Sequence, residues 1–246
     1  MYKAIGLDNL PLIKEGDDLV GIITRAISEK GITIEDRDIV VVTEKIISKA
    51  EGRLVKLDRV TPSKDAKRLA ERTGKDPRIV ELILGESKEI LWADDFIVVE
   101  TKHGFICANA GIDQSNIEDG FAKLLPENPD ASAEKLREGI EAKSGKRIGV
   151  LIVDSWGRPF RNGSVGVAIG ASGIRTLWDR RGEKDIFGRK LEVTRVALGD
   201  CLASAASLIT GEAWEQVPVV IIKGVDFAGA GDAKDLLREK EEDVFR

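Results

Sequence analysis

Acidic and hydroxyl side chains follow a long apolar segment near the middle of the chain. Asp154 and Ser155 come directly after residues 147–153, most of which are apolar. A carboxylate and a hydroxyl at the end of a buried strand can bind a hard cation that carries a nucleotide phosphate. Arg158 and Arg161 follow, and both can bind phosphate or carboxylate oxygens. The alternative is a helix N-cap with solvent-exposed arginines, which the aromatic residues in this loop make the weaker interpretation.

A second polar cluster follows a predicted strand at residues 104–107. Residues 109–116 read Asn-Ala-Gly-Ile-Asp-Gln-Ser-Asn, so small residues allow a tight backbone path. Asp113 and Asn116 can supply oxygen ligands or hydrogen-bonding groups there. An Asx turn that satisfies only its own backbone explains the same residues equally well.

Two further clusters carry charge beside predicted elements. Lys45 and Lys49 follow a predicted strand at residues 38–42, and they share one face if the segment is helical. Paired lysines at the end of a strand suit a triphosphate, although surface lysines are common. Thr210, Gly211 and Glu212 place an acid beside flexible backbone, and an ordinary turn explains them comparably well.

Several kinds of site are absent from the sequence. There is no P-loop pattern, no glycine fingerprint that opens a helix after a strand, and no nucleophile elbow. His103 is the one histidine, and the two cysteines, Cys107 and Cys201, read as small hydrophobes. Any metal must therefore be bound by oxygen, which indicates magnesium, manganese or calcium.

Composition excludes other functions. The 246 residues are 42% hydrophobic and 33% charged, as in an ordinary globular protein. The 38 basic and 43 acidic residues are evenly mixed, so no nucleic-acid partner is expected. The sequence has neither a signal peptide nor an apolar run long enough for a membrane, so we expect a cytoplasmic protein.

Periodicity and turn residues predict the elements that must position these clusters. Helices are expected at residues 17–30, 62–74, 77–85 and 203–208, and a further helix is expected between the stretch at residues 125–130 and Gly145. Strands are expected at residues 38–42, 96–100, 104–107, 147–153 and 218–222. The strand at 147–153 is expected to end at Asp154. This irregular alternation favours an α+β fold. The polar stretch at residues 125–130 is the best candidate for a hinge or a long loop.

Six runs of the sequence, in order, resemble those of the coenzyme F420 gamma-glutamyl ligase family. They are residues 10–13 (Leu-Pro-Leu-Ile), 47–53 (Ile-Ser-Lys-Ala-Glu-Gly-Arg), 109–116, 154–159 (Asp-Ser-Trp-Gly-Arg-Pro), 168–170 (Ala-Ile-Gly) and 185–189 (Asp-Ile-Phe-Gly-Arg). The resemblance covers essentially the whole chain. It implies one ligase domain over residues 1–246, with two α+β subdomains, mixed sheets and an intertwined homodimer.

The resemblance also implies a reaction and a set of site residues. The reaction is the GTP-dependent addition of L-glutamate to a terminal carboxylate of the deazaflavin coenzyme precursor, followed by gamma-linked extension through an acyl phosphate. The implied ions are a pair of Mg²⁺ or Mn²⁺, with K⁺ as a further candidate. By position, the metal ligands are Asp113, Asp154, Ser155 and Glu212. The nucleotide-binding residues are Leu10, Pro11, Leu12, Ile13, Glu44, Lys45, Lys49, Asn116, Thr210 and Gly211. We expect Asp113, Asp154 and Arg158 to act in catalysis.

Two positions depart from the family's pattern. Ser155 replaces a threonine and keeps the hydroxyl, whereas Gly199-Asp200-Cys201 stands where Ala-Asp-Glu is usual. The second departure removes an acid and bears on substrate preference. Two other hypotheses remain open: an amide ligase of the same fold for another acid and amine, and a non-catalytic homologue that binds nucleotide or deazaflavin.

Overall fold

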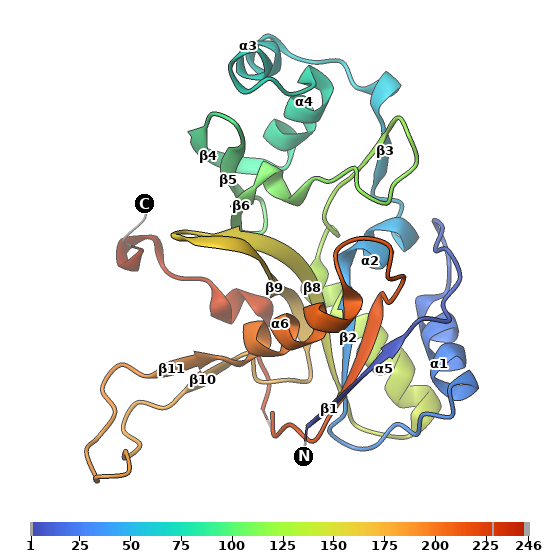
Figure 1. Cartoon of the computed structure of the whole chain (residues 1–246), viewed down its shortest axis with the longest axis vertical. Helices are drawn as coiled ribbons and strands as arrows, with labels where there is room; N and C mark the ends of the chain where they lie inside the picture. Colours follow the sequence, from blue (N-terminus) through green and yellow to red (C-terminus); the bar gives the residue numbers. More distant parts are fainter. Residues whose placement is uncertain (1, 228, 244–246) are drawn as a thin grey trace.

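The computed structural model describes residues 2–227 and 229–243, and it has an α+β fold (Figure 1). The helices are α1 (Leu19–Glu29), α2 (Glu44–Ala50), α3 (Lys64–Thr73), α4 (Pro77–Gly85), α5 (Pro129–Ser144) and α6 (Leu198–Thr210). The strands are β1 (Lys3–Leu7), β2 (Ile39–Thr43), β3 (Leu54–Lys56), β4 (Ser87–Ala93), β5 (Ile97–Thr101), β6 (Ile106–Ala108), β7 (Phe121–Lys123), β8 (Gly149–Arg158), β9 (Arg161–Ser172), β10 (Leu177–Asp179), β11 (Arg195–Ala197) and β12 (Val219–Lys223). Short 3-10 turns occupy Leu57–Arg59, Asn109–Gly111, Ala233–Leu236 and Lys240–Glu242.

A five-stranded mixed sheet in the order β1-β12-β2-β8-β9 forms the centre of the fold. Strands β2 and β8 are parallel, and the other neighbours are antiparallel. Successive side chains of a strand point to opposite faces, so the apolar run of β2 serves two cores. Val40 and Val42 pack with α1 and α5, whereas Ile39 and Val41 pack with α6. Helices therefore cover both faces of the sheet, as the continuous apolar runs of β2 and β12 require.

A smaller part of the molecule lies at the top of Figure 1 and contains the three-stranded sheet β4-β5-β6. Its own core joins α3 and α4 to this sheet, with Val80, Ile83, Ile97 and Val99 fully buried. The short pair β3-β7 completes it. The hairpin β10-β11 projects from the opposite end of the molecule (Figure 1). The α+β prediction with mixed sheets is confirmed.

Two helix boundaries follow the expected capping residues and two helix starts differ, since α6 begins at Leu198 and not at the expected residue 203. Asp76 caps α4 and Pro77 occupies its first turn, while Gly145 ends α5 with φ of 68°. The expected helix start at residue 62 is wrong. Helix α3 begins at Lys64, because the Ser63 hydroxyl accepts a hydrogen bond from the Ala66 amide at 3.1 Å and so acts as the N-cap.

The expected end of the strand at Asp154 is also wrong. Strand β8 continues to Arg158 and returns as β9, because Asp154, Ser155 and Trp156 pair with Val167, Gly166 and Val165. A polar side chain does not interrupt a ladder that is formed by backbone groups. The alternative of a helix N-cap at this position is therefore wrong as well.

Two expectations about larger organisation stay predictions. Residues 125–130 connect β7 to α5, and nothing in the single chain tests a hinge there; the Leu125 side chain is buried in the main core. The intertwined homodimer also stays a prediction. Among the described residues, no helix combines the length and the apolar character that crossing a membrane needs.

Gly170 generates a prediction about the packing of α5 on β9. A Cβ atom at this position would lie 2.4 Å from the Pro129 carbonyl oxygen, and backbone cannot move aside as a side chain can. We expect Gly170→Ala to lower the free energy of unfolding by about 1–3 kcal/mol, measured by urea denaturation. Gly85→Ala is the matched control, because nothing lies within 4 Å of its Cβ. Equal stability of the two variants would contradict this close packing.

Candidate active site

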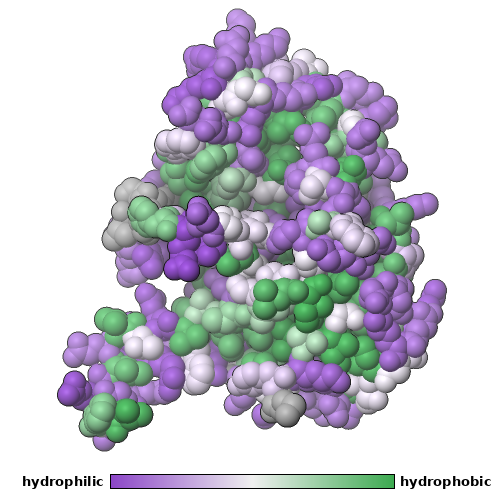
Figure 2. All heavy atoms as spheres, in the orientation of Figure 1, coloured by the Kyte–Doolittle hydropathy of each residue, from purple (hydrophilic) through white to green (hydrophobic). Residues whose placement is uncertain are grey.

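A pocket of about 1390 Å³ lies between the five-stranded sheet and the smaller part of the chain. Its walls come from α2, the loop at residues 109–116, the β8-β9 hairpin, strands β5 and β6, the segment 10–13 and the loop after α6. Figure 2 shows hydrophobic side chains on both sides of this hollow, beneath a mainly hydrophilic upper surface. The polar clusters, which are spread over residues 44–212 of the sequence, therefore meet in one place.

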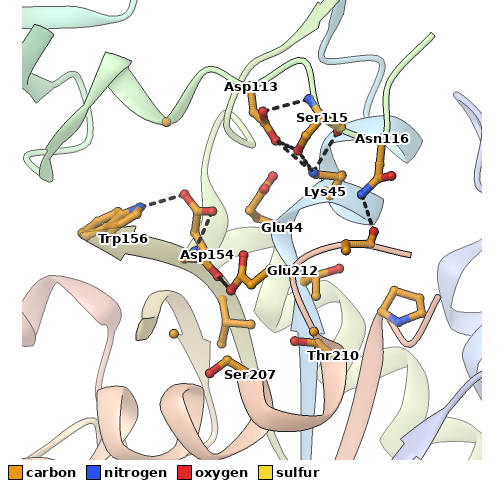
Figure 3. Close-up of a pocket in the computed structure, with 18 of the residues that line it drawn as sticks. Glu44, Lys45, Asp113, Ser115, Asn116, Asp154, Trp156, Ser207, Thr210 and Glu212 are labelled. Carbon is orange, nitrogen blue, oxygen red and sulfur yellow. Dashed lines mark hydrogen bonds and ion pairs between the residues drawn. The ribbon is translucent and has the colours of Figure 1, made fainter. Parts of the chain in front are cut away.

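Asp113 lies at the upper end of the polar part of the pocket (Figure 3). Its Oδ1 atom accepts hydrogen bonds from the backbone amides of Gln114 at 2.7 Å and Ser115 at 2.8 Å, which is an Asx turn. Its Oδ2 atom lies 2.9 Å from Lys45 Nζ. Burial alone would raise the pKa of Asp113, but the hydrogen bonds from Ser115 and Lys45 outweigh it and lower the pKa to about 2. Asp113 therefore forms an Asx turn and also presents an ionised carboxylate to the pocket.

Lys45 and Lys49 lie on α2, as their spacing predicts, and both line the pocket. The Lys49 ammonium donates to the Asn116 carbonyl oxygen at 3.0 Å. The Asn116 side-chain amide in turn donates to the Ala213 carbonyl oxygen at 2.8 Å. Burial and the nearby Lys45 charge lower the pKa of Lys49. This part of the pocket would consequently be stabilised by an added anion.

Asp154 and Glu212 lie on the opposite side of the polar part (Figure 3), and Ser155, which follows Asp154 on β8, also lines the pocket. Asp154 accepts hydrogen bonds from the Ser155 amide at 2.8 Å and from Trp156 Nε1 at 2.7 Å, which holds the carboxylate in place. The Ser155 hydroxyl donates to Glu212 Oε1 at 2.5 Å. The hydrogen bond joins residues that come from β8 and from the loop after α6.

The donor chemistry of these residues fits a hard cation. Across residues 2–227 and 229–243, no three acidic, histidine or cysteine side chains converge into a complete metal-binding group. Instead, Asp113 lies on one side and Asp154 and Glu212 lie on the other (Figure 3), with the Ser155 hydroxyl hydrogen-bonded to Glu212. Mg²⁺ is commonly bound by one or two carboxylates together with substrate phosphates and water, so incomplete oxygen sets of this kind suit a metal–nucleotide complex.

A buried ion pair behind the pocket is not apparent from the sequence motifs. Lys123 Nζ lies 2.8 Å from Glu44 Oε1, and both side chains are almost fully buried. Lys123 also donates to the Gly111 carbonyl oxygen at 3.0 Å. Burial would lower the pKa of Lys123, but the carboxylates of Glu44 and Asp154 outweigh it and raise the pKa, so the ammonium is retained. A lysine inside the apolar run from Ala122 to Leu125 was the signal that could have found it.

The remaining candidate residues also line the pocket. They are Leu10, Pro11, Leu12, Ile13, Arg158, Arg161, Thr210 and Gly211. Arg158 donates from Nη1 to the Gly163 carbonyl oxygen at 3.0 Å, across its own hairpin. Cys201 is exposed on α6 and is not among the residues that line the pocket, whereas Asp200 accepts a hydrogen bond from the Ala168 amide. The acid replaced by Cys201 would therefore have stood outside this pocket.

Comparison with known protein sequences places the chain in the class of ligases. The sequence model of the F420-0:Gamma-glutamyl ligase family matches residues 8–224. The chain belongs to that family. It is 52% identical to the coenzyme F420:L-glutamate ligase of Methanothermobacter thermautotrophicus, with 98% of each chain covered. It is 54% identical to that of Methanocaldococcus jannaschii, over 99% of this chain and 96% of the relative. It is 46% identical to that of Archaeoglobus fulgidus, over 98% of this chain and 94% of the relative.

The buried pair generates a prediction about stability. Burial raises the pKa of Glu44 to about 7 even beside Lys123. In Lys123→Met at pH 8 this buried carboxyl must stay charged without a partner or take up a proton at a cost in free energy, so we expect the free energy of unfolding to fall by about 3–5 kcal/mol. The double variant Glu44→Gln/Lys123→Met should lose less than the single variant, because no buried charge remains. Urea denaturation measures both. Lys56→Met on the neighbouring strand β3 is the control, since this lysine is exposed and should change stability by less than about 0.5 kcal/mol. A double variant that is less stable than Lys123→Met would contradict the argument.

Proposed function

We propose that the chain catalyses the GTP-dependent addition of L-glutamate to the terminal carboxylate of the coenzyme F420 precursor and then extends the product by gamma-linkage. The observation that carries the proposal is the meeting of two lysines with oxygen donors from four segments of the chain at one end of the pocket. The relatives supply the substrate names, because each is called a coenzyme F420:L-glutamate ligase.

The nucleotide is proposed to lie along α2 with its phosphates at Lys45 and Lys49. A charge-assisted hydrogen bond to phosphate is typically worth about 1.5–3 kcal/mol, so two lysines supply substantial affinity. The Lys45–Asp113 ion pair supports this placement, because it holds the ammonium inside the pocket rather than in bulk solvent. The remaining nucleotide contacts are proposed for Leu10 to Ile13, Glu44, Asn116, Thr210 and Gly211, which all line the same pocket.

Asp113, Asp154, Ser155 and Glu212 are proposed to hold a pair of Mg²⁺ or Mn²⁺ ions on the nucleotide. When bound, such ions neutralise the charge that develops on transferring phosphates. The Asx turn of Asp113 and the Trp156 hydrogen bond to Asp154 support these assignments, because both keep a carboxylate oriented before any ligand arrives. K⁺ is included in the proposal as a further ion without a specific contact.

Amide formation from a carboxylate is unfavourable in water, so the carboxylate must first be activated. In the proposed route, an oxygen of the acceptor carboxylate attacks the gamma-phosphorus of GTP and the bond to the bridging oxygen breaks, which releases GDP and leaves an acyl phosphate. The glutamate amine then attacks the acyl carbon, inorganic phosphate leaves with the electrons of the broken C–O bond, and the amine loses its proton to one of the metal-binding acids or to solvent. Arg158 and Arg161 are proposed to hold the acceptor or glutamate carboxylates.

A ligase assay tests the proposal. We expect the purified protein with GTP, manganese, L-glutamate and the coenzyme precursor to add glutamate residues, detected by mass spectrometry.

Asp154→Asn should reduce turnover at least about a hundredfold while changing the free energy of unfolding by about 1 kcal/mol, because asparagine retains an oxygen for one of the two hydrogen bonds. Asp65→Asn, at an exposed position of α3, is the control. Wild-type turnover by Asp154→Asn would remove this residue from the proposed ligands. Failure of the wild-type chain with this precursor would favour another acid and amine or a non-catalytic role.

Lys49 generates a second prediction. Lys49→Ala should weaken apparent GTP affinity roughly ten- to a hundredfold, because it removes a charge-assisted contact to phosphate and each 1.4 kcal/mol is about tenfold. The KM for glutamate should change little. Titration calorimetry with GTP and manganese measures the affinity, and Lys64→Ala, at an exposed position, is the control. A loss confined to the glutamate KM would move Lys49 to the amine site, and no loss would return it to the surface.

A further inference from the structure

Around residues 92–98, the sheet β4-β5-β6 carries apolar side chains on both of its faces, although one face of such a sheet usually meets water. Ile97 and Val99 of β5 point into the core with α3 and α4 and are fully buried. Their neighbour Val98 points to the other face, because successive side chains of a strand alternate. A half-solvated antiparallel sheet normally carries polar residues there.

On the second face, apolar side chains form a row across all three strands. Trp92 of β4 pairs with Val98 of β5, and Val98 pairs with Ala108 of β6. The Phe96 ring lies beside the Trp92 ring with centroids 5.0 Å apart. Trp92 and Phe96 are 46% and 47% exposed, so close to half of each surface remains open. We call Trp92, Phe96, Val98 and Ala108 the apolar face. Exposed apolar patches of this kind mark binding surfaces.

The apolar face is continuous with the candidate active site. Phe96, Val98 and Ala108 line the same pocket as Asp113 and Asp154. Strand β6 packs against β8, which carries Asp154. Figure 1 shows the β8-β9 hairpin passing directly beneath the small sheet. The face therefore opens toward the acids rather than toward a separate part of the surface.

Two further observations show what kind of occupant the face suits. Arg158 and Arg161 of the hairpin line the same pocket, so positive charge is available to an acidic substituent of a ligand. The cavity of about 1390 Å³ also exceeds the roughly 300–1,000 Å³ of a typical single-ligand pocket. A nucleotide that occupies α2 and the segment 10–13 consequently leaves room for a second ligand.

From these observations we propose that the apolar face binds the flat aromatic ring system of the carboxylate substrate, and that the acidic chain of this substrate passes Arg158 and Arg161 toward Asp113 and Asp154. The inference rests on the proposed function and extends it, because it assigns different parts of the pocket to the guanine base and to the deazaflavin ring. The guanine base lies at the segment 10–13, on the main core, and the deazaflavin ring lies on the small sheet. The phosphates and the reacting carboxylate then meet between them.

Steady-state kinetics on Phe96→Ala and Val98→Ser test this assignment. Removing the Phe96 ring should raise the KM for the coenzyme precursor about tenfold, which corresponds to about 1.4 kcal/mol, and the KM for GTP should stay within about twofold. Val98→Ser should act in the same direction with a smaller effect. Tyr2→Ala is the matched control, because it removes an aromatic ring that is exposed and outside the pocket. An unchanged precursor KM in both variants would overturn the inference, as would an equal rise in the KM for GTP.

A binding measurement separates this inference from the proposed function. A deazaflavin chromophore without its acidic chain should bind the wild-type chain, followed by its fluorescence, and Phe96→Ala should weaken that binding by a similar factor. If this holds while the wild-type chain adds no glutamate to the precursor, the aromatic site stands and the proposed reaction fails. If the ligase reaction proceeds and the chromophore binds both chains equally, the aromatic site is wrong and the reaction stands. A change in the mass of the assembly caused by Phe96→Ala, with unchanged chromophore binding, would assign the face to a second copy of the chain.

Discussion

The parallel pairing of β2 with β8 is the constraint on which the rest of the site depends. Thr43 lies opposite Val153, so Glu44 at the start of α2 and Asp154 on β8 emerge at the same edge of the sheet. Two parallel neighbours with apolar side chains on both faces need covering helices, and α1, α5 and α6 provide them. The lysines of α2 are thereby set opposite the hydrogen-bonded carboxylate of Asp154, although more than a hundred residues separate them in the sequence. A one-residue slip of this register would turn every side chain of the strand to the wrong core.

Charge compensation organises the polar end of the pocket around that edge. The buried Lys123 ammonium joins Glu44 of α2 to the Gly111 carbonyl, while the backbone of Lys123 pairs with that of Asp113. Lys45 holds the Asp113 carboxylate from the other side. Figure 3 shows Glu44 between Asp113 and Asp154, so three carboxylates that would repel one another are each fixed by a donor. The loop at residues 109–116 is therefore positioned by ion pairs and not by its own turn alone.

The division of the chain into two packed parts gives the pocket an apolar region in addition to its polar end. The main core includes Ile13 beside the polar end, and the small sheet contributes an apolar face on the opposite side. The proposed reaction of a nucleotide-activated acid with an amine would need this separation, because two large substrates would have to meet at a common centre without competing for one surface. The size of the cavity is consistent with that requirement.

The sequence by itself determined the local elements and the chemistry available to them. Helix caps such as Asp76-Pro77, the apolar run of β2 and the absence of clustered histidines depend on neighbouring residues, so they could be predicted without the fold. The tertiary structure alone decided that β8 continues through Asp154, because its pairing partner is more than ten residues away in β9. It also decided that Lys123 pairs with Glu44 and that β4, β5 and β6 leave an apolar face open, since burial and ion pairing join residues that are distant in the chain. Hydrophobic periodicity shows that a strand has an apolar side, but the neighbouring elements decide whether that side is covered by protein or remains open to a ligand.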